Sequence, residues 1–135
     1  MEITFEKLLL ARDGFKVLSD ENLPLKVSLA VTRVIKVLEE EFAVYTEAKN
    51  KLIRKFGEED KSGNITVTDD NKMDFYEEHD KLLKETVKVD CSMISVDELE
   101  KFQNSFKCPH CEKLVDDNGF KIKPKILYSI SDFLE

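Results

Sequence analysis

The chain has 135 residues, of which 41% are hydrophobic and 36% are charged, and its formal net charge is −7. This length suits one domain with one core, and the apolar content is too high for an intrinsically disordered chain. No run of about 18 apolar residues occurs, so no membrane span is expected. The start of the chain lacks a signal peptide pattern, and three cysteines are an odd number for a disulfide framework. We therefore expect a single soluble domain, residues 1–135, in a reducing cytosol.

Two helices are predicted in the first half of the chain. Apolar residues recur every three or four positions over residues 5–19, and Thr4 suits the N-cap. Pro24 fits the first turn of a second helix, and Gly57 fits its C-terminal cap. At 1.5 Å per residue this second helix would be roughly 50 Å long, against about 30 Å for the diameter of a small domain. Its distal half should therefore project or be covered by a partner, with the contact residues Phe42, Tyr45, Leu52 and Phe56.

Shorter elements are predicted in the second half. A third helix is expected over 71–86, with the apolar side chains Met73, Tyr76, Leu82 and Leu83 facing inward. The capping box Ser95-Val96-Asp97-Glu98 indicates a short helix that ends near Gln103. Residues 106–119 are expected to form a loop, and Pro124 opens a last short helix or turn.

Short alternating or β-branched stretches predict strands at residues 2–5, 65–68 and 86–90. The expected fold class is therefore mainly α (α+β), a long helical hairpin plus a third helix with a small two- or three-stranded sheet. Within the single domain, residues 1–100 would form the helical core with its sheet. Residues 101–135 would form a C-terminal extension.

The negative charge is concentrated in one segment. Residues 58–80 hold nine acidic and two basic residues, whereas the rest of the chain is nearly balanced. No basic cluster suits a nucleic-acid backbone, so direct nucleic-acid binding is not expected. The segment is either a solvated surface or an acidic patch that docks on a basic partner. The acidic residues that would contact such a partner are Glu58, Glu59, Asp60, Asp69, Asp70, Asp74, Glu77 and Glu78.

Cys108-Pro109-His110-Cys111 is the one motif with metal-ligand spacing. Two thiolates at this spacing can bind one zinc ion, but a structural zinc site needs four ligands. Cys91 and one histidine, His110 or His79, could complete a set with Cys108 and Cys111, so the cofactor is either none or one structural zinc ion. The same letters match the redox motif of thioredoxin-like oxidoreductases, but too little chain follows Cys111 for that fold.

No catalytic constellation is found, and we expect a protein that is not an enzyme. The phosphate-binding and dinucleotide-binding glycine patterns are both missing from the sequence. Acid pairs such as Glu77-Glu78 are adjacent in sequence, so their side chains diverge on a helix and cannot face one substrate.

Three short motifs mark the long helix. They are Leu23-Pro24-Leu25-Lys26 at its start, Leu38-Glu39-Glu40-Glu41-Phe42 in its middle and Leu52-Ile53-Arg54-Lys55-Phe56-Gly57 at its end. Together with the Val87-Lys88-Val89-Asp90 strand, this pattern resembles a set of small, uncharacterised tailed-phage proteins over roughly residues 1–100. The resemblance implies a phage-encoded protein of no established enzymatic activity. The Cys108–Cys111 loop departs from the pattern.

The leading hypothesis is a non-catalytic phage-encoded protein-binding module, either virion-associated or accessory, whose long helix supplies the contact surface. The alternative is a small inhibitor of a host enzyme, an anti-defence protein that uses segment 58–80 to occupy a basic site. A zinc-binding protein ranks third. The expected partner is a phage structural or host protein and not a membrane, and self-association is left open. The expected location is the host cytoplasm or the virion.

Overall fold

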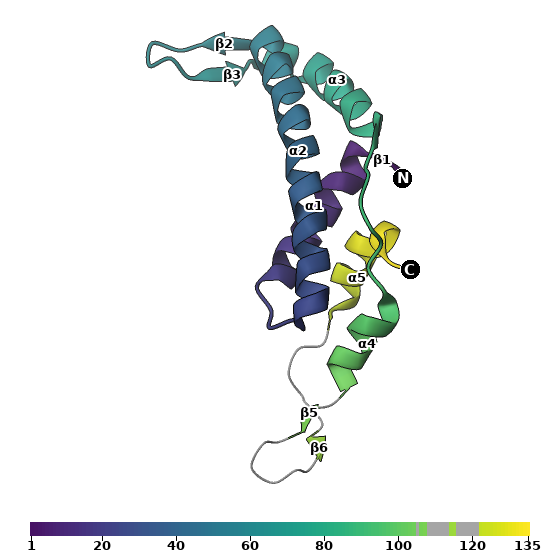
Figure 1. Ribbon diagram of the computed structural model, residues 1–135. Helices are drawn as coiled ribbons and strands as arrows, with labels where there is room; N and C mark the ends of the chain where they lie inside the picture. Colours follow the sequence, from purple (N-terminus) through teal and green to yellow (C-terminus); the bar gives the residue numbers. More distant parts are fainter. Residues whose placement is uncertain (105, 108–113, 116–121) are drawn as a thin grey trace. The chain divides into compact units, whose positions relative to one another are not determined.

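The computed structural model describes residues 1–104, 106–107, 114–115 and 122–135, with only the backbone described from residue 101 to 115 (Figure 1). Helices account for 68% of the described residues, which confirms the expected mainly α fold with small antiparallel sheets. The helices are α1 (Phe5–Ser19), α2 (Leu25–Phe56), α3 (Lys72–Lys84), α4 (Val96–Asn104) and α5 (Pro124–Ile130), with short 3-10 turns η1 (Asp69–Asn71) and η2 (Ser131–Phe133). None of the helices described is long and apolar enough to cross a membrane.

The strands form separate antiparallel pairs. They are β1 (Glu2–Thr4) with β4 (Thr86–Lys88), β2 (Gly57–Glu59) with β3 (Ile65–Val67), and β5 (Phe106–Lys107) with β6 (Leu114–Val115). The first pair was expected, with Ile3 opposite Val87. The expected strand near residue 65 does not join that pair, because it turns back on residues 57–59. The prediction of a loop over 106–119 was wrong at the four residues that form β5 and β6.

Two compact units make up the chain, and both long helices contribute to each. Unit 1 contains Met1–Leu9 and Leu38–Val89, and unit 2 contains Leu10–Val37 and Asp90–Glu135. The boundary between the units therefore does not fall at residue 100. The start of α1 and the end of α2 belong with residues up to Val89, whereas the end of α1 and the start of α2 belong with residues from Asp90 onward.

Unit 1 has a core of apolar side chains from its two termini and from α2. The buried residues are Ile3, Phe5, Leu8, Leu38, Tyr45 and Val89. The rings of Phe5 and Tyr45 lie 5.6 Å apart, which is a favourable separation for an aromatic pair. At the chain start, the backbone of Met1 exchanges two hydrogen bonds with Val89, at 2.8 and 3.0 Å, and these extend the β1–β4 ladder.

Unit 2 buries the facing sides of the first two helices against α5 and η2. The buried residues are Ala11, Phe15, Leu18, Val27, Val31, Val34, Ile94, Leu99, Ile122, Ile130 and Phe133. Phe15 meets Phe133 edge-on, with 5.4 Å between the ring centroids. Ile94 pairs with the C-terminal segment, donating its N–H to Phe133 at 2.8 Å and accepting from Glu135 at 3.0 Å. The regularly spaced apolar residues of these helices therefore lie in the core of the unit.

Gly57 ends α2 as expected, but not as a left-handed cap. Among the glycines that the structure describes, Gly63 is the one with positive φ, and Gly57 instead begins β2. A Cβ at Gly57 would lie 2.5 Å from the Ile53 carbonyl oxygen and 2.5 Å from Ile65 Cγ2. The glycine is therefore required because the chain turns closely against the end of the helix.

Candidate protein-binding surface

The acidic segment predicted from the sequence lies entirely in unit 1. Glu58 and Glu59 are on β2 and Asp60 begins the β2–β3 turn; Asp69 and Asp70 are in η1; Asp74, Glu77 and Glu78 are on α3. All are exposed except Glu78, which is half-buried. Figure 1 shows α3 alongside the C-terminal half of α2, with the β2–β3 hairpin extending from the end of α2.

Asp60 has a structural role in the hairpin turn. Its Oδ1 accepts the N–H groups of Ser62 at 2.8 Å and Asn64 at 3.0 Å, and Gly63 adopts φ 83°. These backbone hydrogen bonds lower the pKa of the Asp60 carboxyl below its usual value. Asp60 therefore stabilises the turn, and the neighbouring exposed Glu58 and Glu59 carry the hairpin's other negative charges.

The acidic residues of η1 and α3 differ in whether lysines pair with them. Asp69 pairs with Lys72, which lowers the pKa of the Asp69 carboxyl, and Asp80 lies 2.6 Å from Lys84. Lys81 is shared by Glu77 at 3.4 Å and Glu78 at 3.1 Å. By contrast, Asp70 and Asp74 form no ion pair with any residue that the structure describes.

Two large apolar side chains lie among these acids. Met73 is 80% exposed and Tyr76 is 59% exposed, one helical turn apart. The prediction that both face inward was wrong. Phe75 instead packs inward, edge-on to Phe56 at 6.4 Å, and it stacks on His79 at 5.7 Å.

We call the exposed set Asp70, Met73, Asp74, Tyr76 and Glu77 the α3 acidic face. Met73, Asp74, Tyr76 and Glu77 are three or four residues apart in α3, so they share one side of the helix, and Asp70 lies just before the helix in η1. Exposed methionine and tyrosine surrounded by charge are typical of contact surfaces, where aromatic and methionine side chains are enriched. The sequence showed the acids of this face but assigned its two apolar residues to the core.

The distal half of α2 is covered by the chain itself, contrary to expectation. Tyr45 is only 5% exposed, and Phe42, Leu52 and Phe56 are half-buried. Phe56 contacts Phe75 of α3, and Leu52 lines an open groove of about 390 Å³ with Leu82. Tyr45 is therefore not available to a partner, and the length of α2 does not require one.

A hydrogen bond fixes α3 on α2 near the centre of unit 1. The Tyr45 hydroxyl and His79 Nε2 are 2.8 Å apart, and Asn71 donates its side-chain N–H to the Phe56 carbonyl at 3.1 Å. Burial lowers the pKa of His79, and Lys49 lowers it further, while burial raises the pKa of Tyr45. The α3 acidic face is thus held on a helix whose opposite side is anchored.

Only one cysteine of the metal site expected from the sequence lies within the described residues. Cys91 is half-buried with a free thiol whose pKa is raised by burial. Cys108, His110 and Cys111 lie outside the described residues. No group of three or more histidine, cysteine or acidic side chains within the described part of the chain is arranged to hold a metal ion.

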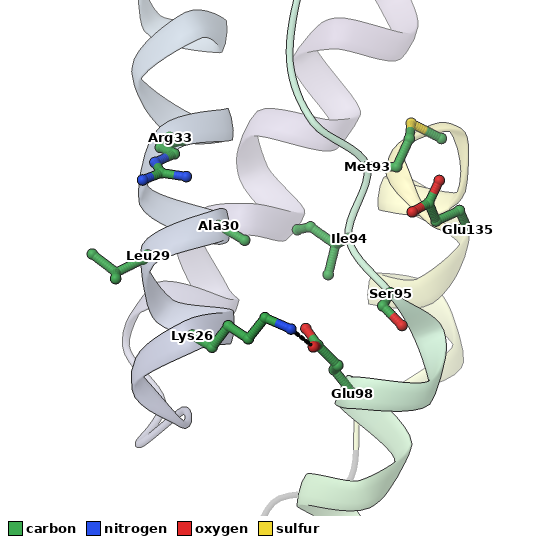
Figure 2. Close-up of a pocket in the computed structure, with 9 residues that line it drawn as sticks. All are labelled: Lys26, Leu29, Ala30, Arg33, Met93, Ile94, Ser95, Glu98 and Glu135. Atoms are coloured by element: carbon green, nitrogen blue, oxygen red, sulfur yellow. Dashed lines mark hydrogen bonds and ion pairs between the residues drawn. The ribbon is translucent and has the colours of Figure 1, made fainter.

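A separate pocket of about 310 Å³ lies in unit 2 between the start of α2 and residues 93–98 (Figure 2). Lys26 pairs with Glu98 across it, and Arg33 lies further along α2. The nine described residues that line this pocket include no histidine or cysteine. Ser95 supplies the one hydroxyl group among these nine residues.

The described residues thus bring exposed acids and exposed apolar side chains together on unit 1. Comparisons with protein-family models, with curated proteins and with solved structures found no match.

Proposed function

We propose that this chain is a non-catalytic protein-binding module that recognises a basic surface through the α3 acidic face. The observation that carries the proposal is the exposure of Met73 and Tyr76 beside Asp70 and Asp74, which form no ion pair with the residues that the structure describes. Apolar contacts supply binding free energy, and charge complementarity gives specificity and speeds association.

The form of unit 1 supports this use of α3. The helix is anchored from behind by the Tyr45–His79 hydrogen bond and by the Phe56–Phe75 contact. A face on a rigid element loses little conformational entropy when it binds, which favours affinity. The partner would offer a shallow apolar depression with lysine or arginine at its rim.

The resemblance to small tailed-phage proteins would make the partner a phage structural protein or a host protein. A virion-associated or accessory role and the inhibition of a host enzyme both use such a contact. The acidic face favours the inhibition of a host enzyme, because a basic nucleic-acid-binding site on such an enzyme would be complementary in charge to this face.

A photoreactive amino acid introduced at Met73 tests the proposal. In host cells that contain the partner, it should crosslink to one defined protein, and Asp70→Lys with Asp74→Lys should abolish the crosslink. The matched control places the same group at Leu25, which is 77% exposed and lies on α2 in unit 2. Equal crosslinking from both positions, or none from position 73, would count against the proposed contact.

A further inference from the structure

A second open surface, of opposite charge, lies in unit 2. It is a groove of about 390 Å³ between α1 and α5, and we call it the α1/α5 groove. The residues that line it are Leu10, Asp13, Gly14, Val17, Lys123, Lys125, Ile126 and Ser129. Its volume lies within the range of sites that hold a few buried side chains or a small ligand, roughly 300–1,000 Å³.

The walls of this groove are apolar and exposed. Leu10 is 46% exposed and Val17 is 45% exposed, seven residues apart on one side of α1. Gly14 lies between them, where α5 packs so closely that a Cβ would lie 2.1 Å from Ser129 Oγ. These side chains are therefore available to another molecule.

The rim of the groove is basic. Lys123 and Lys125 are exposed and form no ion pair with any residue in the described ranges. Asp13 is the acid on the rim, and it lies 3.8 Å from Arg12 of its own helix. An occupant that carries acids beside apolar side chains would complement this groove.

The chain itself carries such a surface. The α3 acidic face presents two exposed apolar side chains one turn apart, and within the described ranges Asp70 and Asp74 form no ion pair. Both its apolar content and its charge match the α1/α5 groove. We propose that the α3 acidic face of one copy docks in the α1/α5 groove of a second copy, with Met73 and Tyr76 in the groove.

This contact joins two different surfaces, so it is heterologous. In the resulting pair one copy keeps a free groove and the other keeps a free face, so association continues to a ring or a filament. Because only two apolar side chains enter the groove, we expect a weak contact that forms at about micromolar to millimolar concentrations. The inference rests on the proposed function, because it names a second copy of the chain as the partner of the same face.

Sedimentation velocity of the full chain across this concentration range tests the proposal. We expect larger species to grow with concentration and to diminish as salt is added. Lys123→Glu with Lys125→Glu, and separately Asp70→Lys with Asp74→Lys, should each weaken association by about tenfold or more, since like charges would face each other. All four residues are exposed, so circular dichroism should be unchanged.

The control matched to the Lys123 and Lys125 variant is Lys36→Glu with Lys61→Glu, which makes the same change in net charge at exposed positions outside both surfaces. It should associate like the native chain. An equimolar mixture of the two interface variants should associate again, because one retains a native face and the other a native groove.

A native chain that stays monomeric at millimolar concentration would overturn the inference, as would interface variants that associate like the control. In that case a crosslink from position 73 to a different protein would leave the proposed function standing. A crosslink from position 73 to a second copy of the chain would support both.

Discussion

Gly14→Ala tests how closely α1 and α5 pack. Alanine is the better helix former, so helix propensity alone would stabilise the protein by about 0.5–1 kcal/mol. A Cβ at this position, however, would lie 2.1 Å from Ser129 Oγ and 2.9 Å from Ile130 Cγ2. Ile130 is fully buried and has no room to move, and overpacking of this kind costs about 1–3 kcal/mol.

The net expectation is a loss of about 1–2 kcal/mol in the free energy of unfolding, because the overpacking term exceeds the gain in propensity. Urea denaturation followed by far-UV circular dichroism measures it. Ser129→Ala is the matched variant, since it removes the closest clashing atom together with the hydrogen bond that Ser129 donates to the Ile126 carbonyl at 2.7 Å. In the double variant, Gly14→Ala should cost less than it does alone. A Gly14→Ala protein more stable than the native one would refute the close packing of these helices.

Three further predictions concern other parts of the chain. Burial lowers the pKa of His79 in the folded protein below its value in the unfolded chain. The free energy of unfolding should therefore be highest above the unfolded pKa and should decrease as the pH falls from the unfolded pKa to the folded pKa. Urea titrations at a series of pH values should show this decrease, and His79→Gln should remove it. Asp60→Ala should speed amide hydrogen exchange at Ser62 and Asn64, measured by NMR, because both N–H groups lose their acceptor; unchanged exchange would mean that the carboxylate does not stabilise the turn. Phe133→Ala should cost about 3–5 kcal/mol in urea denaturation, since the ring is fully buried, and a cost near zero would contradict the core of unit 2.

The sequence predicted the main helices closely because their apolar spacing is long and regular. The helix expected over 5–19 is α1, and the one expected from Pro24 to Phe56 is α2, which begins at Leu25. Such patterns repeat over several turns, so one unusual residue does not change the result.

The third helix shows where sequence periodicity failed. Its apolar residues fall on two arcs, one through Phe75 and Leu82 and the other through Met73 and Tyr76. Either arc could face inward on spacing alone. Contacts with α2 determine which arc faces inward, because Phe75 packs against Phe56 and His79 packs against Tyr45.

The candidate surface was therefore predicted in part. Its acids were visible as a charge imbalance over residues 58–80. Its apolar members were not, because whether a methionine is exposed depends on tertiary packing. The strand at 57–59 was missed for a related reason, since its sequence Gly-Glu-Glu carries no alternation and forms a strand only by pairing with residues 65–67.

The interleaving of the two units has a consequence during synthesis. Unit 1 has all its residues once Val89 has left the ribosome, whereas unit 2 must wait for Phe133 and its neighbours. Domains emerging from the ribosome fold as units, beginning with the N-terminal one. During that interval Val27, Val31 and Val34 of α2 lack the part of their core that α5 and η2 complete, although the unit 2 residues of α1 are already present. A nascent chain paused between these points would therefore expose apolar side chains that the finished chain buries.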